Sequence, residues 1–142
     1  MLNFISGISA TSAALNAERI RMEVVSQNIA NANTTRSLDG KPYRRQQVVF
    51  ESMLQQQSGG RSDLPLAEVR VARIQNDQHP LHTVYNPGHP DANAQGFVDM
   101  PNINVHEEMV DLMTSSRAFE ANLAVAKTAR SMALQTLAIG KR

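Results

Sequence analysis

The sequence predicts a mainly α-helical subunit, with long N- and C-terminal helices forming an antiparallel coiled-coil-like pair and a small extended or β insert between them. Three observations lead to this fold class. Apolar residues recur at helical spacing near both ends of the 142-residue chain, strand and turn formers lie between them, and aromatic residues make up only 4%. We therefore divide the chain into a first helical segment at 1–35, an insert at 36–104 and a second helical segment at 105–142.

The first helix is expected over residues 4–33. Four apolar residues recur within it at intervals of seven: Ile8, Leu15, Met22 and Ile29. A seven-residue repeat keeps one side of a helix against a partner helix, and Val25 falls on the same face. Near its end stand Asn28, Asn31 and Asn33. Asparagine tolerates the left-handed backbone of a helix end, so we expect these side chains to satisfy backbone groups where the helix gives way to the insert.

The insert is expected to hold two strands and an extended loop. Residues 43–50 and 66–74 are rich in strand formers, and a polar spacer at 55–63 separates them. A lone hairpin is only marginally stable, so it must lean on the helices or on a neighbour. Residues 76–104 contain four prolines, and proline interrupts regular elements. We expect an ordered, extended loop there.

The second helix is expected over residues 105–139. Asn104 and Glu107 have the spacing of a capping box, and Gly140 marks the end. At 1.5 Å per residue this helix is about 50 Å long, which exceeds any core that the insert supplies. Its main apolar positions follow a 3–4 spacing: Met109, Leu112, Phe119, Leu123 and Leu137. We interpret the two apolar seams as surfaces for packing between subunits, because so little core is available to cover them.

Composition excludes several classes of function. The formal net charge is +1, which gives no reason to expect binding to nucleic acid or to a membrane surface. No stretch is long and apolar enough to span a membrane. The absence of cysteine excludes disulfides and thiolate metal sites. The N-terminus lacks the basic and apolar regions of a cleaved signal peptide, so we expect a cytosolic protein or one exported without such a signal.

Catalytic and metal-dependent chemistry is weakly supported. His79, His82 and His89 suggest a metal site, as in a metal hydrolase, but His79 and His89 each precede a proline, which is typical of turns. Glu107 and Glu108 are explained by the positive end of the helix dipole. Neither a nucleophile elbow nor a phosphate-binding glycine loop is present. We therefore expect no enzyme and no cofactor.

Three runs of sequence carry a resemblance to a known family. Residues 26–35, Ser-Gln-Asn-Ile-Ala-Asn-Ala-Asn-Thr-Thr, and residues 116–122, Ser-Arg-Ala-Phe-Glu-Ala-Asn, resemble the N- and C-terminal signatures of bacterial flagellar rod, hook and hook-associated proteins. Residues 84–98, which begin Val-Tyr-Asn-Pro-Gly-His-Pro, are similar to proximal-rod members of that family. The resemblance implies a structural subunit of the basal-body rod, in which terminal helices pair around an export channel.

The same resemblance implies partners and a location. They are further copies of the chain, the rod proteins FlgB, FlgF and FlgG, the ring–rod adaptor FliE and the flagellar type III export apparatus, with the assembled rod in the periplasm. Arg117 and Glu120 either pair within the helix or bridge to a neighbour. The expected interface residues are Ile8, Leu15, Met22, Val25, Asn28, Ile29, Asn31, Asn33, Met109, Leu112, Arg117, Phe119, Glu120, Asn122, Leu123 and Leu137. The alternative is a soluble coiled-coil adaptor or chaperone-like protein of a secretion system.

Overall fold

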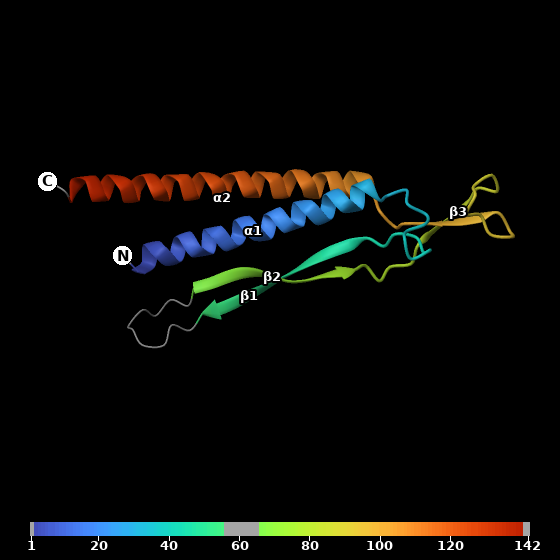
Figure 1. Ribbon diagram of the computed structural model, residues 1–142, viewed down its shortest axis with the longest axis horizontal. Coiled ribbons are helices and arrows are strands. Elements are labelled where there is room, and N and C mark those ends of the chain that lie inside the picture. The colour runs from blue at the N-terminus through green and yellow to red at the C-terminus, as the bar shows by residue number, and fades with distance from the viewer. Residues whose placement is uncertain (1, 56–65, 141–142) are drawn as a thin grey trace.

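Two long antiparallel helices and a small β insert make up the molecule, as predicted. The computed structural model describes residues 2–55 and 66–140, so residues 56–63 of the predicted spacer lie outside the described residues. Helix α1 spans Leu2–Ala30 and helix α2 spans Val105–Ile139. Figure 1 shows the N-terminus of α1 beside the C-terminus of α2. The start of α2 matches the predicted residue, and α1 begins and ends two to three residues before the predicted bounds.

Helix α1 is the central layer of the fold. It packs against α2 on one side and against strands β1 (Gln46–Gln55) and β2 (Leu66–Asn76) on the other. The hairpin therefore leans on a helix, as its marginal intrinsic stability requires. The buried apolar side chains of the described residues are small: Ala17, Val24, Val25, Ala32 and Val98. A core of this kind buries little apolar area per residue, and it leaves many larger apolar side chains on the surface.

Strands β1 and β2 form an antiparallel ladder. Pairing runs from Gln46 opposite Asn76 to Gln55 opposite Leu66, with a bulge between Val49 and Phe50. A bulge increases the local twist of a hairpin. The first strand begins three residues later than expected, because Tyr43 and Arg45 are used for contacts with the helices instead of strand pairing.

Residues 76–104 differ from the extended loop that the sequence led us to expect. Strands β3 (His82–Tyr85) and β4 (Phe97–Met100) pair there in a second antiparallel hairpin. The four prolines do not prevent this, because all of them lie before, between or after the two strands. Tyr85 and Phe97 face each other across the pair, with ring centroids 5.3 Å apart in an edge-to-face arrangement. The prolines of this segment mark the boundaries of short strands and do not exclude strands.

Gly96 makes the turn of this second hairpin possible. Its φ is +83°, and a Cβ at this position would lie 2.9 Å from Cε2 of Tyr85. We expect Gly96→Ala to destabilise the β3–β4 hairpin by about 1–3 kcal/mol, the usual cost of a residue held in an unfavourable backbone region. Amide hydrogen exchange of Val84 and Val98 would measure this.

Gly88→Ala is the matched control in the same loop. A Cβ on Gly88 would meet only Oδ1 of Asn86 at 3.7 Å, and its φ is not positive. Exchange protection equal in both alanine variants would contradict the role assigned to Gly96.

Helix α2 has defined ends. The Asn104 side chain accepts a hydrogen bond from the backbone N–H of His106 and donates one to Glu107. At the other end the backbone N–H of Gly140 donates to the carbonyl of Thr136. These contacts satisfy backbone groups that a helix leaves open at its termini, so the helix begins and ends where the sequence predicts.

Candidate functional site

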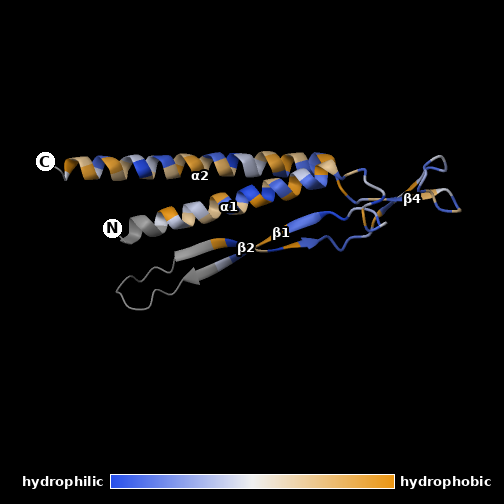
Figure 2. Cartoon of the chain, viewed as in Figure 1, coloured by the Kyte–Doolittle hydropathy of each residue, from blue (hydrophilic) through white to orange (hydrophobic). Residues whose placement is uncertain are grey.

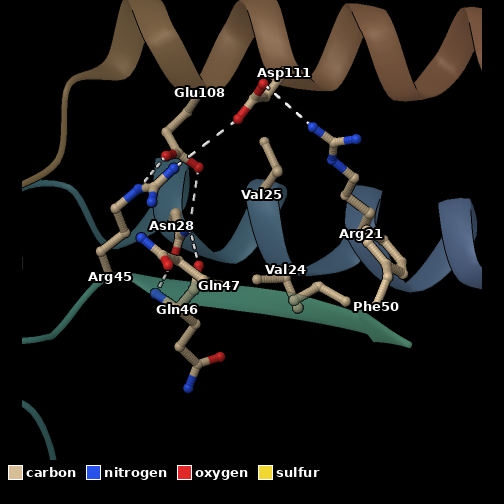
Figure 3. A pocket seen from close by; sticks show the side chains of 11 residues that line it. Arg21, Val24, Val25, Asn28, Arg45, Gln46, Gln47, Phe50, Glu108 and Asp111 are labelled. Atoms are coloured by element: carbon tan, nitrogen blue, oxygen red, sulfur yellow. Dashed lines mark hydrogen bonds and ion pairs between the residues drawn. The ribbon is translucent and has the colours of Figure 1, made fainter. Parts of the chain in front are cut away.

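A polar junction joins α1, α2 and the start of β1. We define the polar junction as Asn28, Arg45, Asp77, Glu108 and Asp111. Figure 3 shows its members other than Asp77. Asn28 and Glu108 are each only 1% exposed. Buried polar groups of this kind are costly unless they are fully hydrogen-bonded, so their contacts decide whether the junction stabilises the fold.

Asn28 satisfies every hydrogen-bonding position of its side chain. Its Oδ1 accepts from the backbone N–H of Gln46 at 2.9 Å and from the Tyr43 hydroxyl at 3.0 Å. Its Nδ2 donates to the Gln46 carbonyl at 2.9 Å and to Oε2 of Glu108 at 3.0 Å. A carboxamide has two acceptor and two donor positions. Asn28 therefore satisfies backbone groups of the insert, as predicted, and it also holds the first pairing residue of β1 against both helices.

Glu108 is held by charge as well as by hydrogen bonding. The Nε of Arg45 lies 2.6 Å from Oε1 of Glu108, while its other nitrogens lie 3.9 Å from Asp77 and 4.0 Å from Asp111. Arg21 of α1 reaches Asp111 at 3.4 Å. Charge-assisted hydrogen bonds are stronger than neutral ones. The arrangement thus fixes the position of α1 relative to α2 and to the β1–β2 hairpin.

A cleft adjoins the polar junction between α1, α2 and β1. Its polar wall includes Arg21, Arg45, Glu108 and Asp111, and its apolar wall includes Phe50. Each of the two acidic side chains is already engaged by an arginine. The chemistry of these groups is therefore that of a joint between segments, in which opposite charges hold one another in place.

Two groups at the junction have shifted pKa values. Burial, and then the nearby negative charge of Glu108, raise the pKa of the Tyr43 hydroxyl above its usual value of 10.0. The backbone N–H of His79, followed by the His79 side chain, lowers the pKa of Asp77 below its usual 3.8. Both shifts favour the form that the hydrogen bonds need: a neutral Tyr43 that donates and an ionised Asp77 that accepts.

The Asp77 shift predicts acid sensitivity. Because its pKa is lower in the folded state, Asp77 stabilises the fold above its unfolded pKa of about 3.8, and this contribution is lost as pH falls through the folded pKa. We expect the difference in unfolding free energy between the wild type and Asp77→Asn to shrink as pH falls below about 4. Urea unfolding at several pH values measures it, with Asp39→Asn as the exposed control. A difference that stays constant over this range would contradict the assignment.

The predicted interface residues divide into two groups by exposure. Buried and half-buried positions on α1 are Val25, Asn28, Leu15, Met22 and Ile29, and Asn31 just after α1 is half-buried as well. Half-buried positions on α2 are Leu112, Phe119 and Asn122. Exposed positions are Ile8, Asn33, Met109, Arg117, Glu120, Leu123 and Leu137. The line of α2 that is least exposed follows a 4–3 spacing through Glu108, Leu112, Ser115, Phe119, Asn122 and Ala126. The side of α2 that packs against α1 therefore consists mostly of small or polar side chains. Many of the larger apolar side chains of α2 remain exposed.

Some of the apolar side chains of the helix pair point away from the β1–β2 hairpin. Val24 and Asp111 line the cleft next to the hairpin. Met22 and Met109 each stand two residues before one of them, and two residues are about 200° around a helix. Both methionines therefore point away from the hairpin. We call this side the outer face and assign to it, from their seven- or fourteen-residue spacing, Ile8, Leu15, Met22, Ile29, Met109, Leu123 and Leu137. Leu15, Met22 and Ile29 are half-buried within the subunit.

Three of the predicted polar contacts can be compared with the structure. Asn31 donates to the carbonyl of Gln27 and its own side-chain oxygen accepts from Thr34, so it satisfies a backbone group at the helix end. The described hydrogen bonds include none to the Asn33 side chain. Arg117 and Glu120 are both exposed, and within the described ranges no ion pair joins them.

Sequence reasoning missed Glu108, Arg45 and Tyr43 as functional residues. Glu108 had been explained by the helix dipole alone. A signal was present, because Glu108 lies at four- and seven-residue spacing from Leu112 and Ser115 on the inward line of α2. A charged residue on an inward line needs a partner. Nothing in the sequence identified that partner as Arg45, which lies 63 residues earlier.

Two of the three histidines considered as metal ligands, His79 and His89, have other contacts. The His79 side chain contacts Asp77, and Nδ1 of His89 accepts from the backbone N–H of Asp91. Among residues 2–55 and 66–140, three or more His, Asp or Glu side chains do not gather in a metal-binding group. Neither described helix has the length and apolarity needed to cross a membrane.

Comparisons with known proteins identify the family. A model described as "Flagella basal body rod protein" matches residues 8–36, and one described as "Flagellar basal body rod FlgEFG protein C-terminal" matches residues 94–139. The FlgC basal-body rod protein of Borreliella burgdorferi is 40% identical, with 97% of this chain and 98% of the relative covered. FlgC of Bacillus subtilis is 39% identical (94% and 96% covered), and FlgC of Salmonella typhimurium is 42% identical (91% and 92%). This chain belongs to the FlgC family of flagellar basal-body rod proteins.

Proposed function

We propose that the chain is a structural subunit of the flagellar basal-body rod and that it assembles through its α1–α2 pair. One structural observation supports assembly through the helix pair independently of family membership. The helix pair exposes large apolar side chains, including Leu123, Leu134 and Leu137. Hydrophobic residues recur along the whole length of α2 (Figure 2). Contiguous exposed apolar surface marks sites of protein association. A rod that transmits torque needs long contacts of this kind between stiff elements.

The proposal includes the wider assembly. Relatives named as basal-body rod proteins support association with other rod components, among which we propose FlgB, FlgF and FlgG, with FliE at the base. We propose a periplasmic rod reached through the flagellar export apparatus. The segments at 1–35 and 105–142 would form its inner layer, and residues 36–104 would lie outside it. The role is mechanical, so no catalytic step is proposed.

The alternative of a cytosolic coiled-coil adaptor explains the helices but not the β insert. In the polar junction, Arg45 and Asn28 tie the start of β1 rigidly to the helix pair. A subunit that transmits torque from an outer part to an inner layer needs such a rigid joint, whereas a helical adaptor does not.

Fractionation together with genetic complementation tests the proposed function. In a strain that lacks the chromosomal copy, the wild-type chain should restore swimming and should copurify with basal bodies. A chain that restores swimming but occurs only in the cytosol would support the adaptor. Unimpaired swimming without any copy of the chain would exclude a required role in the rod.

A further inference from the structure

The β3–β4 hairpin is attached to the molecule without packing on its main elements. No residue of β3 or β4 lies close to α1, α2 or the β1–β2 hairpin in the part of the chain that the structure describes. Figure 1 shows it extending beyond the end of the helix pair. Two short connections lead to it, residues 78–81 and 101–103, and their outer ends are fixed by Asp77 in the polar junction and by Asn104 at the start of α2. A few connecting residues can absorb large rotations, so a further contact is needed to fix the direction of the hairpin.

One side chain makes every hydrogen bond and ion pair found between residues 82–100 and the rest of the described chain. Oδ2 of Asp91 accepts a hydrogen bond from the Thr35 hydroxyl at 2.9 Å, and Oδ1 lies 2.7 Å from Nη2 of Arg36. Both partners follow α1 in the sequence. Residues 76–104 contain no lysine or arginine, so an arginine for Asp91 has to come from outside the hairpin. We call these two contacts the Asp91 latch.

The β3–β4 hairpin is also held together by contacts that do not involve the latch. Its strands form a continuous antiparallel ladder, and the Thr83 hydroxyl donates to Asp99 across the pair. In the turn, Oδ1 of Asn93 accepts hydrogen bonds from the backbone N–H groups of Gln95 and Phe97. These contacts all lie within the hairpin, so they would persist if the hairpin moved as one unit.

Apolar burial alone does not determine the direction of the hairpin. Val98 is its buried apolar side chain, at 3% exposed, but hydrophobic contact is non-directional. Hydrogen bonds, in contrast, require a defined distance and angle. The Asp91 side chain is only 20% exposed, and hydrogen bonds to an ionised group are stronger than neutral ones. The latch is therefore the directional contact of this hairpin.

We propose that Asp91 is a positioning residue that fixes the direction of the β3–β4 hairpin relative to the helix pair, and that without it the hairpin turns about residues 78–81 and 101–103. Arg36 is 67% exposed, and an exposed ion pair contributes little by itself, so the Thr35 hydrogen bond is also required. Because Tyr85 is 65% exposed, the latch also determines where this aromatic ring lies relative to the helices. The proposal concerns the single chain and does not depend on rod assembly.

A distance measurement between two spin labels tests the latch in the full chain. The chain has no cysteine, so Ser26→Cys on α1 and Ala94→Cys in the hairpin place one label on each side of the connections, both at exposed positions. We expect a narrow distance distribution when the rest of the chain is wild type. Asp91→Ala should broaden it and raise the population of other orientations about tenfold, the factor expected for loss of a hydrogen bond to a charged group.

Asp99→Ala is the matched control for Asp91→Ala. It removes a carboxylate of the same hairpin, but the hydrogen bond of that carboxylate, from Thr83, stays within the hairpin. The distribution should therefore remain narrow. Thr35→Val removes part of the latch from the other side and should also broaden the distribution. Adding Thr35→Val to Asp91→Ala should change it no further, because both substitutions act on one contact.

Amide hydrogen exchange of Val84 and Val98 separates the direction of the hairpin from its folding. Protection in Asp91→Ala should equal that of the wild type, because the contacts within the hairpin are intact. Three results would overturn the proposal: a broad distribution in the wild type, an unchanged distribution in Asp91→Ala, or broadening together with lost amide protection, which would make Asp91 a folding residue. Equal broadening in Asp99→Ala would overturn it as well, since the effect would not be specific to the latch.

Discussion

Replacing Glu108 with alanine is expected to lower the free energy of unfolding by about 3–5 kcal/mol, the cost of removing one partner from a buried ion pair. Glu108 is 1% exposed and receives hydrogen bonds from Arg45 and Asn28. The substitution leaves the Arg45 charge and one Asn28 donor without this partner. It also removes the contact that ties α2 to the start of β1, so the hairpin should loosen from the helix pair.

Glu107→Ala is the matched control for this effect. Glu107 is exposed and also lies in the first turn of α2, so its loss removes a helix-dipole contribution of about 0.3–1 kcal/mol. Urea unfolding followed by circular dichroism compares the two variants. Hydrogen exchange of the β1 amides reports the hairpin separately. Equal stability of the two variants would show that the polar junction does not hold the segments together.

Placing a charge on the outer face is expected to prevent assembly while leaving the subunit folded. Leu123 is already 37% exposed in the single subunit, so Leu123→Asp adds little strain to the fold. In an assembled contact the carboxylate would be buried without a partner, at a cost of about 3 kcal/mol or more. That cost weakens each contact by about a hundredfold. Swimming should be lost, while the exported protein remains detectable in the medium or periplasm.

Ile29→Asp tests the same face from α1, and Ser131→Asp is the control for added charge. Ser131 is exposed and does not belong to the outer face. Swimming speed and the amount of chain in purified basal bodies measure the outcome. Normal swimming in both Leu123→Asp and Ile29→Asp would contradict assembly through the outer face.

The sequence predicted the helices well because their signals are local. Capping by Asn104, the stop at Gly140 and the seven-residue repeat from Ile8 to Ile29 each depend on a few neighbouring residues. The β3–β4 hairpin was missed because its stability comes from the Tyr85–Phe97 contact and the Gly96 turn, which become visible only when the strands are paired. The four prolines of this segment also favoured the prediction of a loop.

The polar junction was only half predictable for a related reason. Asn28 was recognised as a residue that satisfies backbone groups, and it does so at Gln46. Glu108 and Arg45 could not be paired from the sequence, because their contact spans 63 residues and depends on how the hairpin leans on α1. Packing of the apolar seams between subunits stays a prediction. Which of their members face the partner helix within the subunit depends on helix rotation, which periodicity leaves open.

A density map of the assembled rod at side-chain resolution tests the central claim most directly. The claim is that copies of this chain assemble through the α1–α2 pair, with the polar junction holding the β insert in place. The account predicts that Ile29, Leu123 and Leu137 lie in helix–helix contacts with neighbouring subunits, while Arg45 still contacts Glu108. A map in which the outer face of the helix pair points to solvent and neighbouring subunits meet only through residues 36–104 would contradict it.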